Sequence, residues 1–202
     1  DNYRHTFVTV DRAEPHKNIV RSINAFGDLL KKRPELVEDV RYLLFLTPGP
    51  THISAYKRLS DEIRRAARRV NEKAPGKQPV KVVEENNFYR AVAALSIYDT
   101  LISVPVVDGS GRSAIDGSLL NTVDGGMILS ETNVAVNVIG QSVAQVGFAD
   151  TQSLTAAMSA AIDESGESRR QKADTMRSAI QGIAFDRTVE QILEELLKSD
   201  RT

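Results

Sequence analysis

Short apolar runs alternate along this 202-residue chain with longer segments in which apolar residues recur every three or four positions. The apolar runs predict buried strands at residues 6–10, 40–47, 80–85, 100–107, 125–131 and 144–149. The longer spacing predicts helices from 19 to near 34, over 53–70, 88–98 and 114–121, and near Val134. From Asp150 onward the pattern is helical, with breaks near Gly166 and Phe185.

This alternation is typical of an α/β protein with a parallel sheet. We therefore expect residues 1–202 to form one Rossmann-like, doubly wound domain with helices on both faces of the sheet. The C-terminal helices, at about residues 150–199, should pack on one side of the sheet. Ligands of such folds bind at the carboxyl ends of the strands. The loops expected there are residues 12–17, 48–52, 84–87, 108–113 and 131–133.

Composition narrows the classes of partner. The chain has 26 basic and 27 acidic residues, so no general attraction for nucleic acid or an anionic membrane is expected. No apolar run is long enough to span a membrane. Cysteine is absent, so no thiolate metal site and no disulfide are expected, which favours a cytoplasmic protein. The histidines His5, His16 and His52 show no metal-ligand spacing, so no metal is expected.

The stretch VDRAEPHKN, residues 10–18, places Arg12 and Lys17 where the first strand meets the first helix. A helix N-terminus has unpaired N–H groups and partial positive charge, so it attracts phosphate. An arginine fork and a lysine point charge would add to that attraction and form a diphosphate site. The alternative is that both side chains are solvated cations in a surface loop.

The stretch VDGSGRSAID, residues 107–116, joins a glycine-rich loop to a helix. Its two glycines and its serine would let backbone N–H groups approach a ligand. Asp108 could accept from sugar hydroxyls, and Asp116, one to two helical turns further on, from a ribose diol. The alternative is a flexible turn before a helix whose early acid favours the helix dipole.

Other polar residues fit structural roles. Asn86 and Asn87 follow a predicted strand, and capping of the next helix is favoured over a binding role. The basic run RRAARR, residues 64–69, shares its helix with acids and favours a solvated helix face. The chain has no GxGxxG, Walker or nucleophile-elbow sequence, which disfavours NAD binding and ATP hydrolysis.

Taken in order, these blocks resemble the C-terminal, donor-binding domain of the trehalose-6-phosphate synthase family, glycosyltransferase family 20, which has the GT-B fold. VDRAEPHKN is similar to the family's V-D-R-x-D-Y-x-K-G, and VPVVDGSGRSAID to T-P-x-x-D-G-M-N-L-V-A-K-E. GGMILSE is similar to G-V-L-I-L-S-E, and INAFGDLLKKRPELVEDVRYLLF follows the family's order of helix, loop and strand. The resemblance covers nearly the whole chain and implies the C-terminal half of a GT-B fold.

The resemblance implies a metal-independent, retaining-type transferase. It would move a sugar or a sugar-like cyclitol from a nucleoside diphosphate to a phosphorylated acceptor. Arg12 and Lys17 would hold the donor diphosphate and stabilise the charge on the departing nucleoside diphosphate. Asp108 would contact the donor sugar, and Asp116 would hold the ribose. The implied donor-binding residues are Asp108, Gly109, Ser110, Gly111, Arg112, Ser113 and Asp116, with backbone at Glu85, Asn86 and Asn87 near the base.

The resemblance also implies an N-terminal acceptor domain, which this chain lacks. The chain starts at Asp1 without an initiator methionine, so we expect a fragment that is inactive alone. No cofactor is expected besides the donor substrate, a GDP-, UDP- or ADP-linked sugar or cyclitol. The expected partners are that donor and a phosphorylated sugar acceptor, with no nucleic acid and no membrane, and an oligomer is compatible with the sequence.

Several positions depart from the family pattern. Glu14 replaces an aspartate, Asn18 a glycine and Asp116 a glutamate, and Met-Asn-Leu has become Ser-Gly-Arg at residues 110–112. The changed loop is the one that would face the sugar. It leaves two alternatives: a pseudoglycosyltransferase that couples GDP-valienol to validamine 7-phosphate, as in the validoxylamine 7′-phosphate synthase branch, or a non-catalytic nucleotide-binding or regulatory module.

Overall fold

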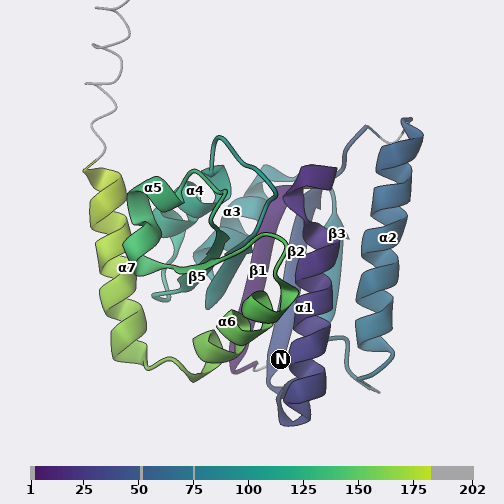
Figure 1. Cartoon of the computed structure of the whole chain (residues 1–202), viewed down its shortest axis with the longest axis horizontal. Coiled ribbons are helices and arrows are strands. Elements are labelled where there is room, and N and C mark those ends of the chain that lie inside the picture. The colour runs from purple at the N-terminus through teal and green to yellow at the C-terminus, as the bar shows by residue number, and fades with distance from the viewer. Residues whose placement is uncertain (1–2, 51, 75, 183–202) are drawn as a thin grey trace, which may run out of the picture.

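A computed structural model of the chain describes residues 3–50, 52–74 and 76–182 (Figure 1). Within these residues, six parallel strands form one sheet with the order β3-β2-β1-β4-β5-β6. The strands are β1 (His5–Arg12), β2 (Val40–Thr47), β3 (Val80–Glu84), β4 (Thr100–Ser103), β5 (Gly126–Ser130) and β6 (Ala144–Val146). Strands β2 and β3 lie on one side of β1, and β4, β5 and β6 lie on the other side. The strand order therefore reverses between β1 and β4.

Helices cover both faces of the sheet. One face carries α1 (Ile19–Lys32), α2 (Ser54–Asn71) and α6 (Thr151–Asp163). The other carries α3 (Phe88–Ser96), α4 (Arg112–Leu120), α5 (Val136–Ile139) and α7 (Gly166–Gln181). Short 3₁₀ helices are η1 (Pro15–Lys17), η2 (Pro34–Glu38) and η3 (Gly140–Ser142). This arrangement confirms the predicted doubly wound α/β fold.

The central strand β1 separates two apolar cores. Phe7 packs against Phe26 of α1, with ring centroids 5.8 Å apart, and belongs to the core on that face. Val8, the next residue, is fully buried on the opposite face with Leu101. Successive strand side chains point to opposite faces, so a strand covered on both faces is a continuous apolar run.

The C-terminal helices differ from the prediction that they share one side of the sheet. Helix α6 packs against α1, whereas α7 packs against α4 and α5 on the opposite face. Glu164 and Ser165 between them are extended, and the Ser165 hydroxyl accepts from the Ser168 N–H to cap α7. This extended link lets the chain pass from one face to the other. The predicted helix at residues 183–199 and the break near Phe185 lie outside the described residues.

Strand β4 is shorter than the predicted strand at residues 100–107 and ends at Ser103. Pro105 has no N–H to donate to a ladder, and the Val106 N–H instead donates to the His16 carbonyl at 2.7 Å. The apolar residues after Ser103 therefore belong to a loop that contacts the β1–α1 connection. Among the described residues, no helix combines the length and the apolar character needed to cross a lipid bilayer.

Candidate functional site

The candidate site lies at the carboxyl edge of the sheet, where the strand order reverses between β1 and β4. The β1–α1 and β4–α4 loops meet there. The Asn18 amide donates to the Val104 carbonyl at 3.0 Å, and the Ser113 hydroxyl donates to the Val10 carbonyl. These bonds join segments that lie far apart in the sequence, so the site exists only where β1 and β4 are paired.

Lys17 lies between two carboxylates. Its ammonium is 2.9 Å from Asp11 Oδ1 and 2.8 Å from Asp108 Oδ2, and only 8% of its side chain is exposed. The structure thus brings together the predicted residues Lys17 and Asp108. Asp11, at the end of β1, is an addition that the sequence did not single out as a partner. The cluster of Asp11, Lys17 and Asp108 links three segments of the site by charge-assisted bonds.

Burial and these bonds shift the acidities of the cluster. Burial opposes ionisation of Asp108, but hydrogen bonds from Lys17 and from the Ser110 and Gly111 N–H groups outweigh it and lower the pKa of Asp108 to about 2. For Asp11, burial is the stronger influence and raises its pKa despite Lys17. Burial would lower the pKa of Lys17, but its contacts with Asp108 and Asp11 outweigh it and raise that pKa. Lys17 is therefore a fixed cation.

Asp108 should stabilise the fold most above pH 3.8, its ordinary pKa, and progressively less as the pH falls toward about 2. Because its folded-state pKa is depressed, the unfolded chain takes up the proton first, so acid favours unfolding. Urea denaturation of the wild type and Asp108→Asn, from neutral pH down to about 2, measures this difference. A difference between the two proteins that stays constant across that range would contradict the prediction.

Arg12 is an accessible cation of the site. Its guanidinium Nη1 lies 2.7 Å from Glu14 Oε1, and 63% of its side chain is exposed. The Glu14 side chain is only 15% exposed, but the arginine end of the pair is solvated, so the guanidinium can exchange Glu14 for a ligand anion. The sequence predicted the same role for Arg12 and Lys17, but their surroundings differ. Lys17 is enclosed by acids, and Arg12 faces solvent.

The β4–α4 loop folds around Asp108. Its Oδ1 accepts from the Ser110 N–H at 2.9 Å, the Ser110 hydroxyl at 3.1 Å and the Gly111 N–H at 3.2 Å. Gly111 has φ +55, and a Cβ there would lie 2.9 Å from both Ala135 Cβ and Asn133 Oδ1. The position therefore requires glycine. The buried Asn133, which the sequence pattern does not single out, lies just after β5. Its amide donates to Ser103 Oγ at 3.0 Å and supports this loop.

Helix α4 begins at Arg112, directly after this loop. The first N–H groups of a helix have no carbonyl partner within it, so the loop presents backbone donors and partial positive charge to the site. The Ser113 side chain is engaged with β1, as described above. Arg112 Nη2 lies 3.2 Å from Asp116 Oδ2, and the two side chains are 73% and 36% exposed. Both charges are within reach of a ligand at the start of α4.

The backbone conformation explains why asparagine can replace the glycine of the family pattern at position 18. Asn18 has φ 60, in the left-handed region, and starts α1. Glycine adopts this conformation most readily, and asparagine tolerates it better than most other residues. The Asn18 amide also donates to the Phe148 carbonyl at 2.8 Å, a bond that glycine could not make.

The β3–α3 loop lies at the same edge, with β2 between it and β1. Asn87 accepts from the Arg90 N–H at 3.1 Å, which confirms its predicted role as a helix cap. Glu85 forms an ion pair with Arg90 at 2.9 Å, and Asn86 is exposed. Sequence reasoning missed the exposed rings of Phe88 and Tyr89 beside these residues, with centroids 5.9 Å apart.

The remaining sequence candidates lie elsewhere. Arg64 of α2 pairs with Glu84 at 2.5 Å, and its neighbours Arg65, Arg68 and Arg69 are exposed, as a solvated helix face predicts. Among the described residues, no three or more His, Cys, Asp or Glu side chains are grouped so that they could hold a metal ion. The candidate site thus consists of Asp11, Arg12, Lys17, Asp108 and the start of α4.

A family model described as Glycosyltransferase family 20 matches residues 1–198 of the chain. Validamine 7-phosphate valienyltransferase of Streptomyces hygroscopicus subsp. jinggangensis (strain 5008) is 28% identical over 185 residues. That alignment covers 92% of this chain and 37% of the relative, so the chain spans little more than a third of that relative's length. The family match confirms the resemblance drawn from the sequence blocks.

Solved structures share the fold. One described as trehalose-6-phosphate from E. coli bound with UDP-2-fluoro glucose has a TM-score of 0.89 at 20% identity, over 96% of this chain and 44% of that chain. An alpha,alpha-trehalose-phosphate synthase (UDP-forming) from Burkholderia xenovorans in complex with glucose-6-phosphate has a TM-score of 0.90 at 18% identity, also over 96% and 44%. These likenesses confirm that the chain has the expected half of a GT-B fold.

Proposed function

Because this chain belongs to glycosyltransferase family 20, we propose that it is the donor-binding part of a longer transferase. Its substrate is a nucleoside diphosphate linked to a sugar or a sugar-like cyclitol, bound at the carboxyl edge of the sheet. The observation that carries this proposal is the meeting of Arg12, the Lys17–Asp108 pair and the N-terminus of α4 at the strand-order reversal.

Each group has a distinct role in the proposed site. The Arg12 guanidinium exchanges Glu14 for the diphosphate, and the first N–H groups of α4 donate to the phosphates. Lys17 holds Asp108 ionised and in position to accept from hydroxyls of the donor. Asp116 accepts from the ribose after its pair with Arg112 opens. Backbone of the β3–α3 loop lies toward the base, beside the exposed Phe88 and Tyr89 rings.

The same groups support transfer of the donor group without a metal. The bond between the donor carbon and the diphosphate oxygen breaks, and the electron pair leaves with the nucleoside diphosphate. The acceptor forms the new bond and releases its proton to the departing phosphate or to water. Arg12 and the α4 N–H groups stabilise the charge that develops on the diphosphate, where preorganised donors are most effective. The acceptor is a phosphorylated sugar or cyclitol held by another part of the protein, and the reaction takes place in the cytoplasm.

Cyclitol transfer, as in a pseudoglycosyltransferase, is a second candidate for the reaction. The loop at residues 110–112 reads Ser-Gly-Arg where the family pattern has Met-Asn-Leu, so the sugar-facing surface is altered. The 28% identity to a validamine 7-phosphate valienyltransferase favours this candidate. Assays of the full-length enzyme with a nucleotide-linked glucose and with a nucleotide-linked cyclitol would separate the two reactions.

A nucleoside diphosphate should raise the melting temperature of the chain, and Arg12→Ala should remove most of that increase. Hydrogen bonds to a charged phosphate are worth about 1.5–3 kcal/mol, so the variant should bind about 10- to 150-fold more weakly. Thermal melting with GDP, UDP and ADP, followed by calorimetric titration with the best of them, measures both effects.

The matched control is Arg58→Ala, which removes an exposed arginine of α2 that lies outside the site. It should melt with the same nucleotide-dependent increase as the wild type. Absence of any increase with all three nucleotides would refute the proposed function. If both variants lose the nucleotide-dependent increase in melting temperature to the same extent, the binding depends on net charge and not on Arg12.

A further inference from the structure

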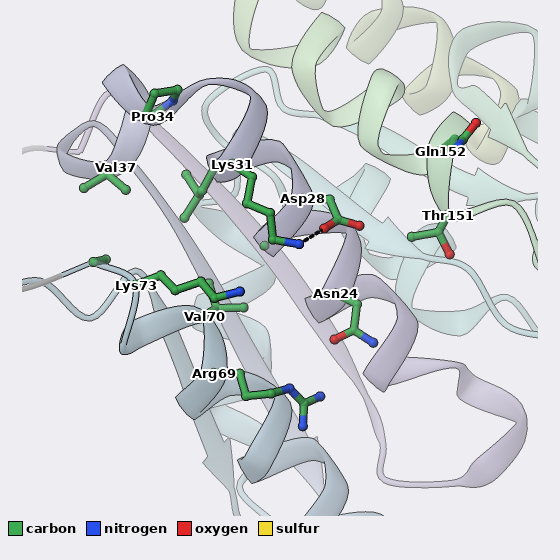
Figure 2. Close-up of a pocket in the computed structure, with 13 residues that line it drawn as sticks. Asn24, Asp28, Lys31, Pro34, Val37, Arg69, Val70, Lys73, Thr151 and Gln152 are labelled. Carbon is green, nitrogen blue, oxygen red and sulfur yellow. Dashed lines mark hydrogen bonds and ion pairs between the residues drawn. The ribbon is translucent and has the colours of Figure 1, made fainter.

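A concavity of about 710 Å³ lies between α1 and α2, on the face of the sheet that α1, α2 and α6 cover (Figure 2). The two helices touch at its floor, where a Cβ on Gly27 would lie 2.8 Å from Val70 Cγ2. Thr151 and Gln152, at the start of α6, form its far side. The Thr155 hydroxyl of α6 donates to a carbonyl of α1 at 3.2 Å. The walls of the concavity are therefore held in a fixed relation to one another.

Cations outnumber acids in this concavity. Its charged lining residues are Lys31, Arg69 and Lys73, with Asp28 as the acid. Figure 2 shows Arg69 and Lys73 extending from the α2 side into the space that faces α1. Lys31 pairs with Asp28 at 2.5 Å, whereas Arg69 and Lys73 have no acid of the described chain within ion-pair distance. The lining thus has an excess of two positive charges.

The sequence concentrates positive charge on this side of the molecule. Residues 54–73, which include α2, hold seven basic and three acidic residues, while the whole chain has a net charge of −1. A local excess of one sign beside a concave surface raises the local concentration of counter-ions.

We propose that this concavity binds a phosphorylated small molecule. A phosphomonoester carries about −1.5 to −2 charge at neutral pH, which matches the excess of positive charge. Arg69 supplies a planar fork for the phosphate oxygens and Lys73 a point charge. Val37 and Val70 offer apolar surface to the organic group, and the volume falls within the roughly 300–1,000 Å³ of small-molecule sites. This site does not depend on the proposed donor site.

Titration with phenyl phosphate, followed by backbone amide NMR, tests the proposal. The titration is made in the Arg12→Ala background, which weakens phosphate binding at the donor site, and at constant ionic strength set with chloride. Saturable shifts should centre on Gly27, Val70 and Ala74. Inorganic phosphate should cause the same pattern with weaker affinity, because it lacks the apolar group.

Two pairs of substitutions, on α2 and in the turn that follows it, give a charge-matched comparison. Arg69→Gln with Lys73→Gln should weaken binding at least tenfold, whereas Arg58→Gln with Arg65→Gln, outside the concavity, should change it less than about twofold. All four side chains are exposed, so both variants should fold. Equal losses in the two variants, or shifts that do not saturate, would overturn the proposal and leave only diffuse attraction to a basic helix.

Discussion

Replacing Lys17 with methionine should lower the free energy of unfolding by about 3–5 kcal/mol at neutral pH. The lysine is the counter-ion of Asp11 and Asp108, both with side chains only 9% exposed. Its removal leaves two buried carboxylates close together without a cation. Methionine keeps much of the apolar stem, so the loss arises from charge and not from a cavity. Urea denaturation followed by circular dichroism measures it.

Lys31→Met is the matched control for this prediction. Lys31 also pairs with an aspartate, Asp28, but its side chain is 57% exposed, so its loss should cost less than about 1 kcal/mol. Adding Asp11→Asn to Lys17→Met should recover part of the lost stability, because one of the unpaired buried charges is removed. Similar losses for Lys17→Met and Lys31→Met would show that the buried cluster does not stabilise the fold.

Replacing Gly111 with alanine should destabilise the chain by about 2–5 kcal/mol and weaken nucleotide binding at least tenfold. The left-handed conformation costs an L-residue about 1–2 kcal/mol, and overpacking typically adds about 1–3 kcal/mol. The new methyl group would lie 2.9 Å from Ala135 Cβ and Asn133 Oδ1, so the loop and the start of α4 must shift. Denaturation and calorimetric titration with a nucleoside diphosphate measure the two effects.

Gly109 offers a control within the same loop. A Cβ there would meet no atom within 4 Å, so Gly109→Ala should change the unfolding free energy by less than about 0.5 kcal/mol. If the two alanine variants lose the same stability, the loop does not need its tight approach to Asn133 and Ala135, which follow β5.

Much of the fold follows from local pattern. The run Val40–Thr47 was predicted as a strand and is β2 without change, because its side chains alternate between two covered surfaces. The order of elements sufficed to predict the doubly wound sheet. The sequence pattern does not predict which face of the sheet α6 and α7 cover. Each helix has one apolar stripe, and the stripe alone does not determine the face of the sheet against which the helix packs.

The sequence predicts candidate site residues, but it does not predict their electrostatics. Arg12 and Lys17 have similar positions in the sequence, yet 63% of one side chain and 8% of the other are exposed. The difference comes from Asp108, which lies 91 residues from Lys17 and reaches it only because β4 pairs with β1. Partners brought together by strand pairing leave no local signal. Asp11 is close to Lys17 in the sequence, but their contact depends on how the β1–α1 connection turns, which the sequence pattern does not show.

The pairing of β1 with β4 also has a consequence for folding kinetics. Phe7 of the first strand lies opposite Thr100, so the two strands meet only after a long segment has been ordered. Contacts of such high sequence separation form slowly because their loop-closure entropy must be overcome first. An isolated segment of β1, β2 and β3 would bury β1 on one edge only and would lack Asp108. Nucleotide binding during refolding should therefore appear with the last cooperative phase and mark completion of the sheet.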